Sequence, residues 1–252
     1  MTFSKLTSLI ITACTLLTAC EDKKADNGNT LTVGVCADYA PFEYYKDGEL
    51  VGFDIDLMKE IARRLNKDVK FKDMSFDAIL GSLTTGRLDA AVSSIEATDE
   101  RRKSMDFSNE YIKSPRTMVC KATSSIQTVS DLAGEKIGVQ SGSTHETYAK
   151  GSLSEDVKLT VKSLTKIPDL LQDMEIGNVA CVIMGIDEAE SIKKSRPNIK
   201  LISLPGEVSG AAVALPKRSP LTDTVNQILE EMEADGSLTK LKEQWLPHDA
   251  PL

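Results

Sequence analysis

Two kinds of apolar pattern alternate along the chain from residue 31 onward. Some segments alternate apolar and polar residues, as half-buried strands do, and others place apolar residues on one face of a helix. In the first half, these patterns predict strands at 31–36, 69–74 and 88–93 and helices at 54–65 and 76–85. Such alternation predicts parallel sheets with helices on both faces.

The second half of the chain repeats this pattern. It predicts strands at 136–140, 157–161 and 179–184 and helices at 144–150, 167–175, 221–233 and 238–245. Residues 83–92 and 174–183 also echo one another, because each runs from a helix end through a glycine into an apolar strand. The repetition favours two α/β lobes of similar build, and it leaves open one larger α/β sheet.

Composition and charge narrow the class of protein. Hydrophobic residues make up 41% of the 252 residues and charged residues 27%, as in ordinary globular proteins. The 38 acidic residues outnumber the 30 basic ones, which argues against a general nucleic-acid binder, because such proteins concentrate positive charge. With two histidines and no Cys/His cluster, neither a metal site nor a cofactor is expected. The sequence also contains no G-x-S-x-G or Walker A motif, so it gives no catalytic residues.

The first twenty residues resemble an export signal. Lys5 precedes an apolar run at 6–17 that is too short to span a bilayer as a helix. The run leads into Leu17-Thr18-Ala19-Cys20, which resembles the lipobox of bacterial lipoproteins. We therefore expect residues 1–20 to be a lipoprotein signal peptide, with lipidation at Cys20 and a flexible polar tether at 21–30. An ordinary secretory signal is the alternative.

Three further cysteines, Cys36, Cys120 and Cys181, follow the predicted signal. Their odd number requires at least one free thiol and argues against a disulfide-stapled scaffold. Because Cys181 falls in a predicted buried strand, we expect it to serve packing.

Polar segments follow the predicted strands, where open α/β sheets bind their ligands. After the first strand, Tyr39 and Phe42 either wall a pocket or pack on the core. After the strand at 88–93, Arg101 lies one turn into a short helix that Thr98 caps. A guanidinium there is suited to gripping a carboxylate, and the alternative is a solvated surface charge.

A third polar segment, residues 138–146, consists of a strand, a glycine turn and a helix start. Ser143 and Glu146 have the spacing of a capping box. The free N–H groups of such a helix start either bind an anion or are only capped. His145 stands at the same helix start, where a cap or surface role is more usual than that of a base.

Several motifs together resemble the family 3 bacterial extracellular solute-binding proteins, the polar amino-acid receptors of ABC importers. The matching residues are Tyr39-Ala40-Pro41-Phe42, Gly52-Phe53-Asp54-Ile55-Asp56-Leu57, Phe76-Asp77, Gly86-Arg87-Leu88-Asp89-Ala90, Thr98-Asp99-Glu100-Arg101, Asp106-Phe107-Ser108, Gly138-Val139-Gln140-Ser141-Gly142-Ser143-Thr144 and Asp235-Gly236-Ser237-Leu238. Their order and spacing cover about residues 31 to 246.

The resemblance implies a two-lobed α/β fold of the periplasmic-binding-protein type, joined by two crossover strands that act as a hinge around an interlobe cleft. Lobe 1 would comprise residues 30–112 plus 210–246 and lobe 2 residues 113–209, leaving 247–252 as a tail.

The resemblance also implies a set of ligand-binding residues. In such proteins, an arginine matching Arg101 binds the ligand α-carboxylate, assisted by backbone N–H groups matching Glu96 and Thr144. A carbonyl matching Ser94 accepts a hydrogen bond from the ligand ammonium. Further pocket positions match the aromatic residues Tyr39 and Phe76, which sandwich the ligand side chain, and Ser93, Gln140, Ser143 and His145.

The chain departs from the family pattern around the ligand ammonium. The family usually has an acidic residue after the strand that ends near Met184, whereas this chain has Gly185 at that position. The family also often has a small hydroxyl residue at the position where this chain has Glu96. An ammonium buried without a negative partner is costly, so we expect Glu96 to have taken over this role. One alternative is that a shifted loop brings Asp187 to the site, and another is that Glu96 binds a cationic side chain.

A further departure concerns the choice of ligand. Receptors for lysine and arginine in this family often carry an aspartate at the position of Cys36, whereas here Asp38 lies two residues later. The ligand therefore remains open among polar, basic and sulfur-containing amino acids.

The expected function is that of a monomeric receptor, lipid-anchored on the periplasmic or cell-surface face of a bacterial membrane. It would bind a free amino acid and deliver it to the permease and ATPase of an ABC importer, with no nucleic-acid partner and no enzymatic activity. One alternative is an enzyme resembling the cyclohexadienyl dehydratases, which use the same fold; another is a sensory or surface lipoprotein.

Overall fold

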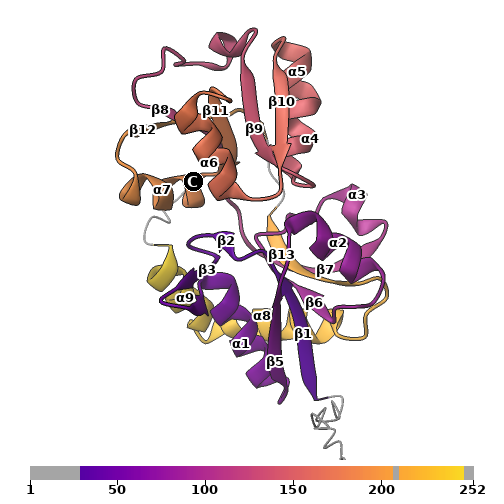
Figure 1. The fold of residues 1–252 in the computed structure, drawn as a ribbon. Helices are drawn as coiled ribbons and strands as arrows, with labels where there is room; N and C mark the ends of the chain where they lie inside the picture. Colours follow the sequence, from indigo (N-terminus) through magenta and orange to yellow (C-terminus); the bar gives the residue numbers. More distant parts are fainter. Residues whose placement is uncertain (1–28, 207–209, 247–252) are drawn as a thin grey trace, which may run out of the picture.

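Two five-stranded sheets, each flanked by helices on both faces, form two lobes (Figure 1). The computed structural model describes residues 29–206 and 210–246. The predictions for the signal peptide, most of the tether, Cys20 and the tail at 247–252 lie outside the described residues.

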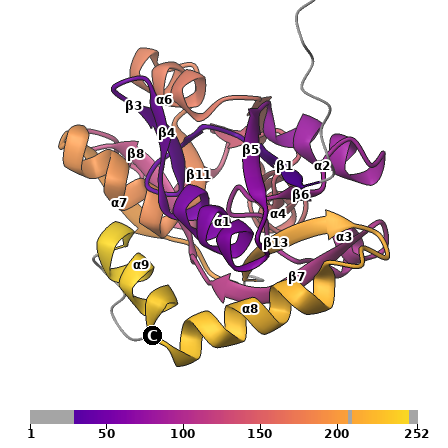
Figure 2. The ribbon, with the colours of Figure 1, turned by 90° about the horizontal axis from the view of Figure 1, so that it is seen from below.

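The first lobe is built on a sheet with four strands from the first half of the chain and one from near its end. Its strand order is β5 (Asp68–Asp73), β1 (Thr30–Val35), β6 (Ala90–Ala91), β13 (Ala211–Pro216) and β7 (Met105–Ile112). Its helices are α1 (Phe53–Arg64), α2 (Phe76–Thr84), α3 (Asp99–Arg102), α8 (Thr222–Ala234) and α9 (Ser237–Trp245). Seen from below, α8 runs along the sheet beside β7, and α9 packs against α1 (Figure 2).

The second lobe is built from one continuous stretch of chain. Its strand order is β10 (Thr160–Leu164), β9 (Lys136–Gln140), β11 (Cys181–Gly185), β8 (Arg116–Lys121) and β12 (Ile199–Ser203). Its helices are α4 (Thr144–Lys150), α5 (Ser152–Asp156), α6 (Ile167–Ile176), α7 (Ile186–Ser195) and the 3₁₀ turn η1 (Val129–Leu132). A small three-stranded sheet, β2 (Asp38–Tyr39), β3 (Glu43–Lys46) and β4 (Glu49–Val51), projects from the first lobe toward the second.

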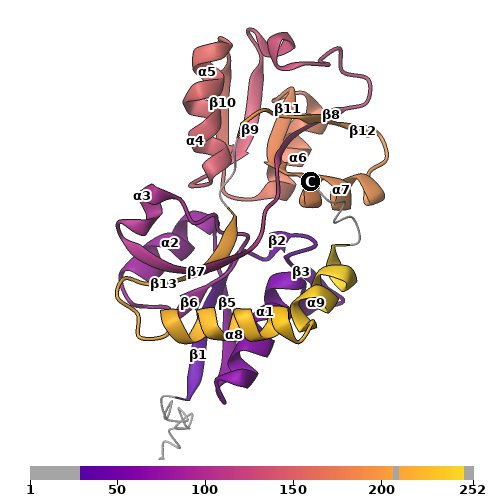
Figure 3. The same ribbon diagram turned by 180° about the vertical axis from the view of Figure 1, so that it is seen from behind.

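Both sheets are mixed, so the prediction of parallel sheets is wrong for part of each. β13 runs antiparallel to β6 and β7, and β8 runs antiparallel to β11 and β12. The physical reason is that these strands carry the chain from one lobe to the other and are not joined by the crossover helices that make strands parallel. Figure 3 shows the chain continuing from β7 in the lower lobe into β8 in the upper one.

The core of the first lobe lies on both faces of its sheet, because side chains alternate along each buried strand. In β13, Val213 and Leu215 join a cluster with residues of α1 and α8. Ala212 and Ala214 face the other way and pack with Ile79 of α2. Among the described residues, no helix is long and apolar enough to cross a membrane.

A disulfide bond joins Cys120 of β8 to Cys181 of β11 in the second lobe. The two residues are directly opposite one another in the antiparallel register, and both are fully buried. Cys181 packs in the core of its buried strand, as expected, but it also forms a disulfide bond. The sequence did not show this bond, because the contact depends on the pairing of β8 with β11. Cys36 is the free cysteine of the described part of the chain.

Candidate functional site

A small cavity lies between the two lobes and takes its walls from both. It is lined by Cys36, Asp38, Tyr39, Phe76, Ser93, Ser94, Glu96, Arg101, Gln140, Ser143, Thr144 and His145. The cavity thus brings together every residue proposed from the sequence for ligand binding except Asp187. It also adds Cys36 and Asp38, which were not proposed as ligand-binding residues.

Arg101 places a positive charge in this cavity. Thr98 begins α3, and its hydroxyl accepts a hydrogen bond from the Arg101 backbone N–H at 3.3 Å, as predicted for the cap. The guanidinium lies 5.4 Å from the Phe76 ring centre and donates to the carbonyls of Glu96 at 2.9 Å and Gly142 at 3.1 Å. Desolvation lowers the pKa of Arg101, whereas the Glu96 carboxylate opposes that shift. A half-buried guanidinium oriented in this way is suited to binding a carboxylate.

Glu96 links the two lobes beside Arg101. The hydroxyl of Thr144, in the second lobe, donates to one Glu96 carboxylate oxygen. The other oxygen lies 3.8 Å from the guanidinium of Arg116. Glu96 therefore reaches from the first lobe to Thr144 and Arg116 of the second, and a ligand ammonium would compete with Arg116 for it.

The start of α4 supplies the opposite wall. The Ser143 hydroxyl accepts from the backbone N–H of Glu146 at 3.1 Å and donates to the Gln140 carbonyl at 2.7 Å. The Glu146 carboxylate accepts from the Gly142 N–H at 2.7 Å, so it reaches back one residue further than in a standard capping box.

His145, in the same wall, is buried. Desolvation lowers its pKa to about 3, helped by the positive charges of Arg116 and Arg101. The ring is therefore neutral at physiological pH.

Ser93 and Ser94 form the floor of the cavity and are held from below by two fully buried carboxyl groups. The Ser93 hydroxyl donates to Glu43 at 2.5 Å, and the Ser94 N–H donates to Asp54 at 2.8 Å. Glu43 and Asp54 are also hydrogen-bonded to each other, which requires a proton between them. Burial raises the pKa of Glu43, and it raises that of Asp54 to about 6. Asp54 belongs to the Gly52-Phe53-Asp54 motif noted in the sequence, but its contact with Ser94 could not be read from it.

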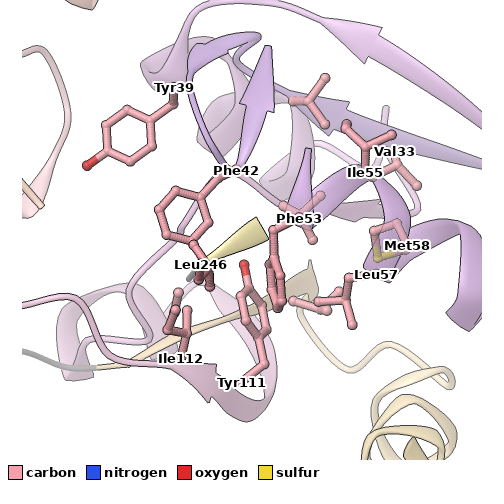
Figure 4. Packing of buried hydrophobic residues seen from close by; sticks show 14 of the residues in the cluster. Val33, Tyr39, Phe42, Phe53, Ile55, Leu57, Met58, Tyr111, Ile112 and Leu246 are labelled. Carbon is pink, nitrogen blue, oxygen red and sulfur yellow. The ribbon is translucent and has the colours of Figure 1, made fainter. Parts of the chain in front are cut away.

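Tyr39 has a place in both the cavity and the core. Figure 4 shows its ring at the edge of the cluster of Phe42, Phe53 and Tyr111, with its hydroxyl pointing away from them. Phe42 is fully buried in that cluster. The sequence left open whether these two aromatic residues line a pocket or pack in the core. In the structure, Tyr39 lines the cavity and Phe42 packs in the core.

The Tyr39 hydroxyl crosses to the second lobe, where it accepts from the Gly185 N–H at 3.2 Å. The carboxyl group of Glu188, which is 1% exposed, lies close to this hydroxyl. A Cβ atom at Gly185 would lie 2.7 Å from the Ser114 hydroxyl and 3.3 Å from that of Tyr39. The space that a side chain at Gly185 would enter is thus filled by the hydroxyls of Ser114 and Tyr39.

Asp187 does not line the interlobe cavity. It lies in the first turn of α7 and borders a separate hollow with Pro41, Tyr44 and Trp245. The alternative in which a shifted loop brings Asp187 to the site is therefore not what the structure shows, because β11 continues straight into α7 at Gly185.

The comparisons with known proteins agree with this geometry. The model of the bacterial extracellular solute-binding proteins, family 3, matches residues 31–248. The chain belongs to this family. It is 35% identical to the arginine-binding extracellular protein ArtP of Bacillus subtilis (strain 168), over 94% of this chain and 96% of that protein. It is 29% identical to the L-cystine-binding protein TcyJ of Escherichia coli (strain K12), over 90% and 86% respectively.

Solved structures of the family share the fold. An ancestral arginine-binding protein bound to arginine matches with a TM-score of 0.82 at 35% identity, covering 86% of this chain and 98% of that chain. The family resemblance and the two-lobed α/β fold inferred from the sequence are thereby confirmed. These relatives are named as binding proteins, not as enzymes.

Proposed function

We propose that the protein is an extracytoplasmic receptor that binds one amino acid between its lobes and delivers it to an ABC importer. The observation that carries this proposal is the half-buried guanidinium of Arg101, oriented by two backbone carbonyls in a cavity walled by both lobes. A ligand that contacts both walls favours the closed arrangement over the open one and thereby signals its presence to the permease.

In this proposal Arg101 binds the ligand α-carboxylate, assisted by the backbone N–H groups of Glu96 and Thr144. The Ser94 carbonyl and the Glu96 carboxylate receive the ammonium. The ligand side chain lies between Tyr39 and Phe76, and Ser93, Gln140, Ser143 and His145 complete the wall.

The proposal extends to the whole chain and its location. Lobe 1 comprises residues 30–112 plus 210–246, and lobe 2 residues 113–209. Lipid on Cys20 holds the receptor, as a monomer, on the periplasmic or cell-surface face of the membrane. The protein carries out no reaction, since its relatives are named as binding proteins.

A thermal-shift screen of the purified protein against the twenty amino acids, ornithine and cystine tests the proposal. A ligand that binds only the folded state stabilises it by about 2.7 kcal/mol at a hundredfold excess over Kd. We expect one or a few amino acids to raise the melting temperature, and prephenate to have no effect. No shift with any amino acid, or turnover of prephenate, would overturn the proposal.

Arg101→Ala provides the residue-level test of the same proposal. Removing the charged partner of a charged ligand group is expected to weaken binding by about 2 kcal/mol, or about thirtyfold. Arg102→Ala is the matched control, because Arg102 packs over Phe107 in the first lobe and does not line the cavity. Equal weakening by both variants would remove Arg101 from the ligand site.

A further inference from the structure

A carboxyl group of the second lobe is buried at the contact between the two lobes. Glu188 belongs to the first turn of α7 and is almost fully buried. This helix begins directly after Gly185, whose N–H donates to the Tyr39 hydroxyl of the first lobe. Figures 1 and 3 both show β2, which contains Tyr39, at the edge of the first lobe that faces α6 and α7. Glu188 therefore lies where the first lobe covers the second.

The polar groups that act on the Glu188 carboxyl group belong to the opposite lobe. Burial is the largest influence, and it raises the pKa of Glu188 well above its ordinary value. The Tyr39 hydroxyl lies close to the carboxyl group and opposes this shift, whereas the negative charge of Asp38 adds to it. Both residues form β2, so the environment of Glu188 is set by a strand of the first lobe.

The sheet behind α7 directs no compensating charge at Glu188. The helix packs against β8, β11 and β12, which contribute apolar residues to the core cluster that also holds Ala189 of α7: Val119, Val182, Met184, Ile199 and Leu201. The charged side chains of these strands have other partners. They are Arg116, which lies over the Tyr148 ring, Lys121, which donates to the Glu175 carbonyl, and Lys200, which donates to the Ser124 carbonyl.

The other charged residues around α7 are also placed away from Glu188. They are Asp187 and Glu190, which border the separate hollow, Lys193 and Lys194, which are exposed in the last turn of α7, and Lys113, which pairs with Glu110 at 3.6 Å. Within the described part of the chain, no cation acts on the Glu188 carboxyl group. A negative charge on it would therefore be both buried and uncompensated, which is costly.

The charge of Glu188 depends for this reason on the distance between the lobes. Opening about a hinge moves β2 away from α7, so it admits water to the carboxyl group and removes the negative charge of Asp38. Both changes lower the pKa of Glu188 toward the ordinary value of a glutamate, about 4.3. Closing reverses them, so at a pH between the two values the carboxyl group takes a proton from the solvent as the lobes close.

We infer that Glu188 couples closing of the lobes, and with it the binding of an amino acid, to the uptake of one proton. This inference rests on the proposed function, from which it takes the hinge motion, and it adds a dependence of affinity on pH. Because the pKa of Glu188 is higher in the closed arrangement, its contribution to binding is complete below about pH 4 and is lost as the pH rises through the raised value. Over that interval, Kd is expected to rise by up to about tenfold per pH unit.

Proton uptake is measured by isothermal titration calorimetry at pH 6 in buffers of different ionisation enthalpy. The probe is L-arginine, which a relative binds, and the amino acid with the largest thermal shift replaces it if arginine gives none. We expect the wild-type protein to take up about one proton per amino acid bound, and Glu188→Gln to take up almost none, because its amide does not titrate. Glu190→Gln, two residues further along α7, is the matched control and is expected to keep the uptake.

The buried pair Glu43 and Asp54 does not interfere with this measurement. Both lie inside the first lobe beneath the cavity floor, so their surroundings stay the same when the lobes close. If Glu188→Gln does not fold, Glu188→Met provides an apolar side chain of similar length and is expected to show the same loss of uptake.

The outcomes separate this inference from the function on which it rests. If an amino acid binds to the wild-type protein without proton uptake, the coupling is overturned and the receptor function stands. The same holds if the Glu188 variant takes up as many protons as the wild type. If no amino acid binds, the proposed function itself fails.

Discussion

The disulfide bond of the second lobe allows a stability prediction of known size. Cys120 and Cys181 are 61 residues apart in the sequence, so the bond closes a long loop in the unfolded chain. In the chain-entropy model, a loop of this length corresponds to about 4 kcal/mol at 25 °C. Because small domains are stable by only about 5 to 15 kcal/mol, loss of the bond is expected to remove a large part of the stability of the second lobe.

The assay is urea unfolding at 25 °C, followed by circular dichroism, with and without a thiol reductant. We expect reduction to lower the free energy of unfolding by about 2 to 4 kcal/mol, and Cys120→Ala/Cys181→Ala to lower it by a similar amount. Reductant should have no further effect on the double variant. Cys36→Ala is the control, because Cys36 is free and the effect of reduction should persist in this variant. A shift below about 1 kcal/mol on reduction, or the same shift in the double variant, would refute the reasoning.

Two further predictions concern the first lobe. Gly52 has a φ of 135°, and a Cβ there would lie 2.1 Å from the Phe42 carbonyl oxygen, so Gly52→Ala is expected to cost at least about 3 kcal/mol in urea unfolding. Gly81→Ala, in α2 with open space around it, should instead stabilise by about 0.5 to 1 kcal/mol, and equal effects of the two would contradict the argument. The third prediction concerns pH. Burial raises the pKa of Glu43, and it raises that of Asp54 to about 6, so folding favours the protonated form of both carboxyl groups. This contribution to the free energy of unfolding is complete below about pH 4 and is lost as the pH rises through the raised pKa values. Glu43→Gln should flatten this decline in melting temperature between pH 4 and 8, and an unchanged profile would count against the shared proton.

Long amphipathic segments could be predicted well from the sequence. The helix expected at 54–65 is α1, Phe53–Arg64, and the one expected at 221–233 is α8, Thr222–Ala234. Their apolar stripes span several turns, so a local pattern is enough to place them. The strand expected at 88–93 is only β6, Ala90–Ala91, because its extent depends on its neighbours β1 and β13.

Features that depend on distant pairing could not be read from the sequence. β13 enters the first sheet from the far end of the chain, and the bond between Cys120 and Cys181 needs the register of β8 against β11. In the site, Arg101 could be proposed because its segment matches a family motif. Asp38 was noted in the sequence but was not proposed as a ligand-binding residue, because its place in the cavity depends on the packing of β2 against α6.

The position of β13 also sets the order in which the molecule can be completed. The five strands of the second sheet, β8 to β12, are consecutive in the sequence, so that sheet can close as soon as β12 has been synthesised. The first sheet keeps a gap between β6 and β7 until residues 211–216 follow. In a chain that stops before β13, the second sheet is complete, but the edges of β6 and β7 that β13 would pair with stay open. Such unpaired strand edges are sites for aggregation. The first sheet is therefore completed later in synthesis than the second, when residues 211–216 have been made.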